Sequence, residues 1–245
     1  VTGLDCAGPF MVYAKNGHPK KVWILIFTCT MSRFVHLHVL DNLTSLAVFE
    51  AIISLWTIHG PIKQFISDNG TNFVGAANII HSDSKKIIQF LRETRNDIET
   101  ELAEKTHTSW AFIPVQSPWF GGFYERLIQS VKKAIAASIE DKKISRIAFN
   151  IALQEAAHRI NCRPLTHNPV SAEDEEVLTP HHLAKNRSGW PILQSIHGMK
   201  NIPDPLSDKN QYRRGRILAE EMSKRFTLQY LPILTKRTKW FKECE

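Results

Sequence analysis

The chain has 245 residues, a mass of 28.0 kDa, a pI near 9.3 and a net charge of +7 at neutral pH. Hydrophobic residues make up 43% and charged residues 22%, which is the balance of a soluble globular protein with a packed core. No apolar run of about 18 residues and no signal-peptide pattern occurs, which argues against a membrane span and predicts an intracellular protein. The excess of basic residues favours a polyanionic partner such as nucleic acid.

Three strands are predicted at the start of the chain. Asp5 lies on a short segment that we expect to be the first of them. Residues 22–29 form a continuous apolar, β-branched run, which is typical of a central strand buried on both faces. Residues 34–39 alternate between apolar and polar, as a neighbouring strand with one exposed face would. The turn at Ser32-Arg33 joins these two runs into a hairpin, so three antiparallel strands are expected to open the domain.

Helices and strands then alternate along the chain. Thr44 or Ser45 can cap a helix that runs to His59 and ends at Gly60-Pro61. Residues 65–67 predict a fourth strand and residues 110–115 a fifth, and further helices are expected at 87–105, 123–141 and 145–159. This order predicts an α/β protein of RNase H-like fold, with a mixed five-stranded sheet flanked by helices.

Composition divides the chain into three parts. Residues 187–205 are rich in Gly and Pro and predict an irregular connection. Residues 207–245 hold ten Lys and Arg against five Asp and Glu, so this segment carries +5 of the net charge of +7. We therefore expect a core domain at 1–165, an irregular linker at 166–206 and a basic C-terminal extension at 207–245.

Three carboxylates stand in distinctive settings. Asp68 follows a short apolar run and begins the turn Asp-Asn-Gly-Thr-Asn-Phe, which taken alone most often marks only a turn. Asp5 lies in Gly-Leu-Asp-Cys-Ala-Gly-Pro, and Glu125 follows Pro-Trp-Phe-Gly-Gly-Phe-Tyr. Together they indicate a metal site for phosphoryl transfer.

The predicted helix at 123–141 presents Glu125 away from its buried face. At 100° per residue, Glu125, Gln129 and Lys132 fall on one side of the helix, and an apolar stripe lies on the other. That stripe consists of Phe123, Leu127, Val131 and Ala134. A carboxylate in a first helical turn also complements the helix dipole, which is the alternative role of Glu125.

The segments at 68–76, 118–125 and 161–166 resemble the integrase core of retroviruses and LTR retrotransposons, and most closely the BEL/Pao group. This resemblance implies that Asp5, Asp68 and Glu125 are the acidic triad of that family. Residues 225–240 are similar to the start of a basic C-terminal module found in these polyproteins. The resemblance further implies transposon ends and target DNA as partners, assembly into a homo-oligomer and a nuclear and cytoplasmic location.

The chemistry that the triad implies needs two Mg²⁺ or Mn²⁺ ions about 3.5–4 Å apart. Hard carboxylate oxygens are the ligands that such ions prefer. Asp5 is expected to bridge both ions, while Asp68 and Glu125 each hold one. Water would first trim a 3′ end, and the new 3′-hydroxyl would then attack target DNA. The sequence thus predicts a polynucleotidyl transferase that performs 3′-end processing and strand transfer.

Contacts with DNA are expected from residues near the triad and in the basic segment. They are Asn72, Gly121, Gly122, Gln129, Lys132, Arg213, Arg214 and Arg216. The resemblance assigns Lys132 to the transposon end, against the alternative of a solvated lysine. Asn72 can equally be a turn former.

Zinc binding is not expected from this sequence. The four cysteines lie far apart without a CxxC pair, which argues against a disulfide framework and a cysteine zinc site. The histidines form no convincing ligand pattern, and the adjacent imidazoles of His181 and His182 would rarely point at one metal. The histidines considered are His36, His38, His158, His181 and His182. Two other functions stay open: a catalytically lapsed, domesticated DNA-binding protein, and an RNase H-like nuclease that only hydrolyses.

Overall fold

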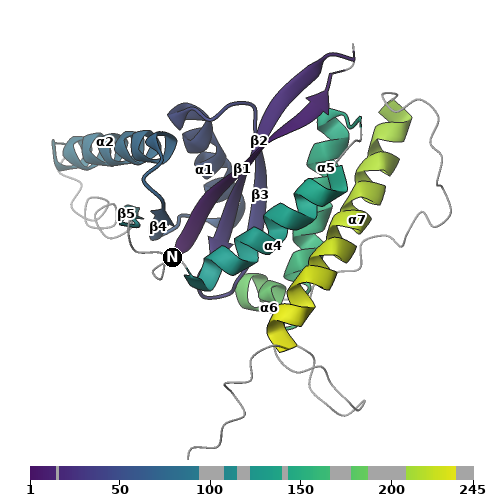
Figure 1. Ribbon diagram of the computed structural model, residues 1–245. Coiled ribbons are helices and arrows are strands. Elements are labelled where there is room, and N and C mark those ends of the chain that lie inside the picture. Colours follow the sequence, from purple (N-terminus) through teal and green to yellow (C-terminus); the bar gives the residue numbers. More distant parts are fainter. Residues whose placement is uncertain are drawn as a thin grey trace, which may run out of the picture. The chain divides into compact units, whose positions relative to one another are not determined.

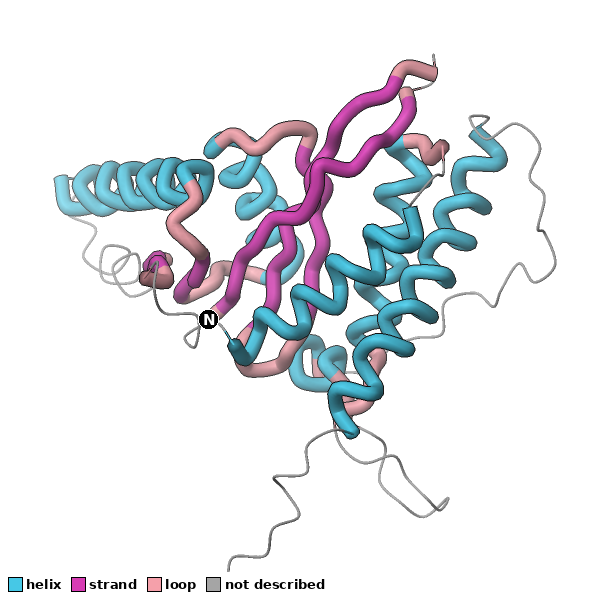
Figure 2. The backbone as a smooth tube through the Cα atoms, in the orientation of Figure 1, coloured by secondary structure: helices cyan, strands magenta, loops and turns pink. Residues whose placement is uncertain are grey.

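The computed structural model describes residues 1–14, 17–93, 108–114, 122–139, 143–165, 178–186 and 208–235. Five strands form one sheet in the order β3-β2-β1-β4-β5, and they can be followed in Figure 1 and Figure 2. Their bounds are β1 Thr2–Tyr13, β2 Pro19–Cys29, β3 Val35–Leu40, β4 Gln64–Ser67 and β5 Ser109–Phe112.

The strand directions confirm the mixed sheet. β4 runs parallel to β1 and β5 runs parallel to β4, whereas only short turns join β1 to β2 and β2 to β3, as in antiparallel hairpins. Three consecutive strands followed by parallel strands that alternate with helices are the arrangement of an RNase H-like fold. The expected fold class is therefore confirmed.

The helices agree with the predictions in part. Their bounds are α1 Ser45–His59, α2 Thr71–Glu93, α4 Gly122–Ile139, α5 Arg146–Asn161, α6 Pro180–Lys185 and α7 Asp208–Thr235. α1, α4 and α5 lie where helices were expected. α2 begins well before the expected residue 87, so the prediction was wrong for residues 71–86; residues 94–107 lie outside the described part. α6 interrupts the segment expected to be irregular.

The first helix shows why its bounds were predictable. Thr44 has extended backbone dihedrals, and its hydroxyl accepts a hydrogen bond from the Ala47 N–H at 3.2 Å. Gly60 takes a φ of 80° and donates its N–H to the Trp56 carbonyl at 2.8 Å. None of the described helices combines the length and apolar character that a membrane span requires.

The chain splits into two compact units, and the division passes through the first three strands. The first unit comprises Val1–Pro9, Lys21–Met31 and His38–Tyr124. Its core lies between the sheet and the packed pair α1 and α2. Buried residues from every part of this unit join in it, among them Leu4, Phe27, Ile52, Phe65 and Phe73.

The second unit comprises Phe10–Lys20, Ser32–Leu37 and Glu125–Glu245. In it α7 packs along α5, and Leu218, Ala219, Met222 and Phe226 are buried. A Cβ on Gly215 would lie 2.8 Å from the Ile151 side chain, so the two helices approach closely there. The basic segment is therefore built into the core of this unit over the residues of α7.

Candidate active site

The register of the sheet brings two of the three predicted carboxylates side by side. Cα partners on the parallel strands β1 and β4 are Thr2 with Phe65 and Gly3 with Ile66. Two residues further along, Asp5 lies level with Asp68, which directly follows the end of β4. If the alternation of side chains along β4 continues for one residue into the turn, both aspartates lie on the same face of the sheet. Both are accessible, since Asp5 is half-buried and Asp68 is exposed.

Asp68 is held in a turn that leads directly into α2. One carboxylate oxygen, Oδ1, accepts a hydrogen bond from the Gly70 N–H at 3.0 Å. The Gly70 carbonyl in turn accepts from the N–H groups of Phe73 and Val74, both at 3.0 Å, at the start of the helix. The carboxylate therefore lies just before the N-terminus of α2, where the helix dipole favours negative charge.

Hydrogen bonds with β5 and with the residue after it fix the end of β4. The Ile113 N–H donates to the Ser67 carbonyl at 2.9 Å, and the Trp110 indole N–H donates to the Ser67 hydroxyl at 3.0 Å. The side-chain amide of Asn69 donates to the Ile113 carbonyl at 3.1 Å. These bonds connect the turn around Asp68 to β5 and the residue after it, so the position of Asp68 is well defined.

Asn72 contacts the strand that carries Asp5. Its side-chain amide lies 3.8 Å from Cys6 Sγ, as a weak N–H···S hydrogen bond. This contact links the first turn of α2 to β1 and gives Asn72 a supporting role beside the two aspartates. A DNA contact by Asn72 stays a prediction.

Glu125 lies in the first turns of α4, and its side chain lies outside the described part. The stripe expected opposite it is confirmed where side chains are described, since Leu127, Val131 and Ala134 are buried. Gln129 is exposed and Lys132 half-buried on the face of Glu125. Gly122 is the first residue of α4, and Gly121 lies outside the described residues. The convergence of all three carboxylates therefore stays a prediction.

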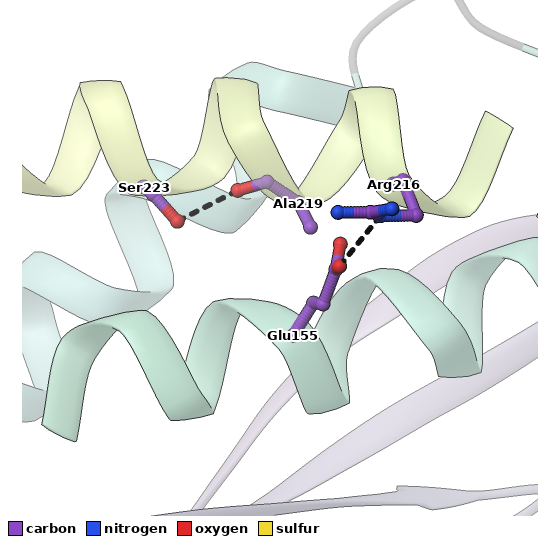
Figure 3. Close-up of polar contacts among 4 residues, drawn as sticks. All are labelled: Glu155, Arg216, Ala219 and Ser223. Carbon is purple, nitrogen blue, oxygen red and sulfur yellow. Dashed lines mark hydrogen bonds and ion pairs between the residues drawn. The ribbon is translucent and has the colours of Figure 1, made fainter. Parts of the chain in front are cut away.

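The arginines of α7 differ in their surroundings. Arg213 is exposed, whereas Arg214 donates a hydrogen bond to the Lys143 carbonyl at 3.1 Å. Arg216 is 8% exposed, and its Nε lies 2.8 Å from a carboxylate oxygen of Glu155 on α5 (Figure 3). This ion pair argues against the predicted contact of Arg216 with DNA, because the guanidinium is buried in the helix interface. Its role is to join α5 and α7.

The segment at 161–166 resembles integrases. Its described residues, 161–165, have a structural role. The Asn161 side chain accepts the Val35 N–H at 2.8 Å and donates to the Val35 carbonyl at 2.7 Å. Arg163 donates to the carbonyls of Ile160 and Arg33, both at 2.8 Å. These bonds attach the end of α5 to β3 and the turn before it.

A cluster that the sequence reading did not identify lies at the same end of α5. His158, Cys162 and His181 place their ligand atoms within 4.8 Å of one another. Burial raises the pKa of the Cys162 thiol above its ordinary value, and the nearby Arg159 guanidinium partly offsets this effect. That these residues lie together was not foreseen from the sequence; whether they bind a metal stays open at this point. The available signal was the four-residue spacing of His158 and Cys162, which puts both on one face of a helix.

A comparison with solved structures finds similarity to two of viral origin. The catalytic core domain of BIV integrase is 17% identical over 76% of this chain and 93% of that chain, with a TM-score of 0.43. The simian T-cell lymphotropic virus intasome, solved in complex with PP2A regulatory subunit B56 gamma, is 15% identical over 84% of this chain and 64% of that chain, with a TM-score of 0.47. No family model and no curated protein matches the sequence.

Proposed function

We propose that the protein is a metal-dependent polynucleotidyl transferase that integrates retrotransposon DNA. The observation that carries this proposal is the register of the parallel strands β1 and β4, which brings Asp5 on β1 level with Asp68 directly after β4, with both residues accessible. A structural role would not require two acidic side chains level with each other, because like charges on adjacent strands are destabilising. A bound cation would remove that repulsion.

The donor set fits Mg²⁺ or Mn²⁺, because carboxylate oxygens are the hard ligands that these ions prefer. In this proposal Asp5, Asp68 and Glu125 are the residues that would hold two such ions. Such ions would activate the attacking oxygen and neutralise the leaving oxygen of a phosphodiester. The Gly70 N–H keeps the Asp68 carboxylate in one orientation before DNA arrives. Transposon ends and target DNA are the proposed substrates, within a homo-oligomer.

The proposal is tested with Asp68→Asn, which keeps the size of the side chain and removes its charge. Nicking of supercoiled plasmid and joining of a labelled duplex that carries the parent element's end are measured in Mg²⁺ and in Mn²⁺. We expect both activities to fall at least about 100-fold, because charge stabilisation of the transition state is lost. The matched control is Asp83→Asn, which removes an exposed charge from α2, the helix that follows Asp68, and should leave both activities unchanged.

The outcomes distinguish an integrating transferase from a nuclease that only hydrolyses and from a DNA-binding protein without catalytic activity. Nicking without any joined product would identify a nuclease that only hydrolyses. DNA binding without metal-dependent nicking in the wild-type protein would identify a catalytically lapsed binding protein. Activity of Asp68→Asn within a few-fold of the wild type would refute the role of Asp68.

A further inference from the structure

We propose that His158, Cys162 and His181 form a binding site for Zn²⁺, separate from the carboxylates of the proposed active site. The three residues belong to one compact unit and come from two elements, the C-terminal end of α5 and the first turn of α6. Among the residues that the structure describes, this is a group of three His and Cys side chains whose ligand atoms lie close enough together to share an ion.

The distances suit a tetrahedral zinc ion. Zn–S and Zn–N bonds of about 2.3 and 2.0 Å at tetrahedral angles place a sulfur and a nitrogen ligand about 3.5 Å apart. The Cys162 Sγ and His158 Nε2 atoms are 3.7 Å apart, close to that separation. Every pair of ligand atoms in the cluster is within 4.8 Å, so binding requires the atoms to move together by only about 1 Å.

The backbone places these side chains for two independent reasons. His158 and Cys162 are four residues apart and therefore share one face of α5. His181 is carried by α6, which begins with a capping box in which the Thr179 N–H donates to His182 Nδ1 at 3.1 Å. That bond engages the neighbouring imidazole in the cap and leaves His181, 2% exposed, to face α5. Of these two adjacent histidines, His182 therefore caps α6 and His181 is the proposed zinc ligand.

The type of donor selects the metal. One thiolate and two imidazoles are borderline-soft ligands, which favour Zn²⁺ over Mg²⁺ or Ca²⁺. The carbonyl end of α5, where Cys162 is the cap residue, adds partial negative charge that favours a cation. A fourth position of the tetrahedron would be completed by water.

A zinc ion at this site would join α6 to α5. α6 has six residues, and isolated helices of that length are not stable in water, so tertiary attachments must hold it. The described attachments include the edge-on contact of His181 with the Phe34 ring, whose centroids lie 5.4 Å apart, and the His158–His181 ring contact at 4.8 Å. With zinc bound, the imidazoles of His158 and His181 would be ligands of the same ion.

The test uses Co²⁺ as a spectroscopic replacement for Zn²⁺ in the whole 245-residue protein carrying Asp68→Asn, so that the carboxylate site does not contribute. We expect one equivalent of Co²⁺ to give a thiolate-to-cobalt charge-transfer band in the near ultraviolet, which Zn²⁺ abolishes on addition. Cys162→Ser should remove the band, and His181→Asn should weaken Co²⁺ binding at least about 10-fold. Matched controls are Cys29→Ser for the thiol and His81→Asn, an exposed histidine on α2, for the imidazole, and both should keep the band.

Thermal unfolding gives a second readout that does not depend on the spectrum. Zn²⁺ at 100 times its Kd should raise the Tm of the wild-type protein by about 5–10 °C and that of Cys162→Ser by much less. The metal-free Tm of each variant shows whether it folds. A band that survives in Cys162→Ser, the absence of a band in the parent protein, or equal Tm shifts in Cys162→Ser and Cys29→Ser would each overturn the proposal. None of these results depends on DNA cleavage, so the two proposals succeed or fail separately.

Discussion

At the scale of single residues, the turn after β4 has little room for additional atoms. A Cβ on Gly70 would lie 2.7 Å from Asn72 Oδ1 and 3.1 Å from Asp68 Oδ1. Both atoms are at the ends of flexible side chains, which can move aside without disturbing the backbone. The glycine therefore leaves room for the orientation of the Asp68 carboxylate rather than for the fold itself.

Gly70→Ala should therefore separate activity from stability. We expect DNA cleavage to fall about 10- to 100-fold, because displacing a catalytic group by about 1 Å has effects of that size. The free energy of unfolding, measured with urea, should change by less than about 1 kcal/mol. Gly75→Ala is the contrasting variant: its Cβ would collide with the Ser45 side chain at the start of α1 and should cost about 1–3 kcal/mol. Full activity of Gly70→Ala would show that this turn does not position a catalytic group.

At the scale of elements, the ion pair between α5 and α7 identifies the basic segment as part of the fold. Glu155 and Arg216 have 12% and 8% of their side chains exposed and lie on facing helices. Within the described part of the chain, the Glu155 Oε2 atom is buried and has no hydrogen-bond partner. Removing one partner of such a pair leaves an uncompensated buried charge, whereas removing both exchanges the pair for apolar packing.

Arg216→Met should consequently lower the free energy of unfolding by about 3–5 kcal/mol, and Glu155→Met with Arg216→Met should restore most of it. Urea denaturation of the two single variants and the double variant measures the coupling. Lys224→Met is the control, since its ion pair with Glu220 is largely exposed and should contribute less than about 1 kcal/mol. If the double variant is stable but binds duplex DNA much more weakly than the wild type, Arg216 has a role in DNA binding that its burial argues against.

The elements also show what the sequence could predict. α1 was predictable because Thr44 and Gly60 are local capping signals, and β2 because its apolar run is continuous. The start of α2 was missed because the Asp-Asn-Gly turn was given more weight than the helical spacing of Phe73, Ala76 and Ile80, all of which are buried. Local sequence patterns were enough to predict α1 and β2, and they also contain the spacing that marks the start of α2.

Contacts between distant segments were beyond the sequence. The pairing of Glu155 with Arg216 depends on how α7 packs on α5, and charge counting placed Arg216 at the surface instead. The cluster of His158, Cys162 and His181 depends on where α6 packs, which no local pattern records. By contrast, the sequence placed Asp5 on the first predicted strand and Asp68 just after the fourth, and the register of β1 with β4 then brings the two residues level.

At the scale of the whole molecule, the proposed function requires Glu125 to join Asp5 and Asp68. The two aspartates belong to one compact unit and Glu125 to the other. Two-metal catalysis requires all three carboxylates to surround the same pair of ions. The convergence of the three carboxylates is therefore the central requirement of the proposed function.

Cleavage of the protein backbone by hydroxyl radicals from Fe²⁺, bound in place of Mg²⁺, tests this claim most directly. Zn²⁺ is added first to fill the proposed histidine–cysteine site. We predict cuts close to residues 5, 68 and 125 together, suppressed by excess Mg²⁺ and lost in Asp68→Asn but not in Asp83→Asn. Cuts near residues 5 and 68 without a cut near residue 125, or a pattern unaffected by Mg²⁺ and by Asp68→Asn, would contradict it.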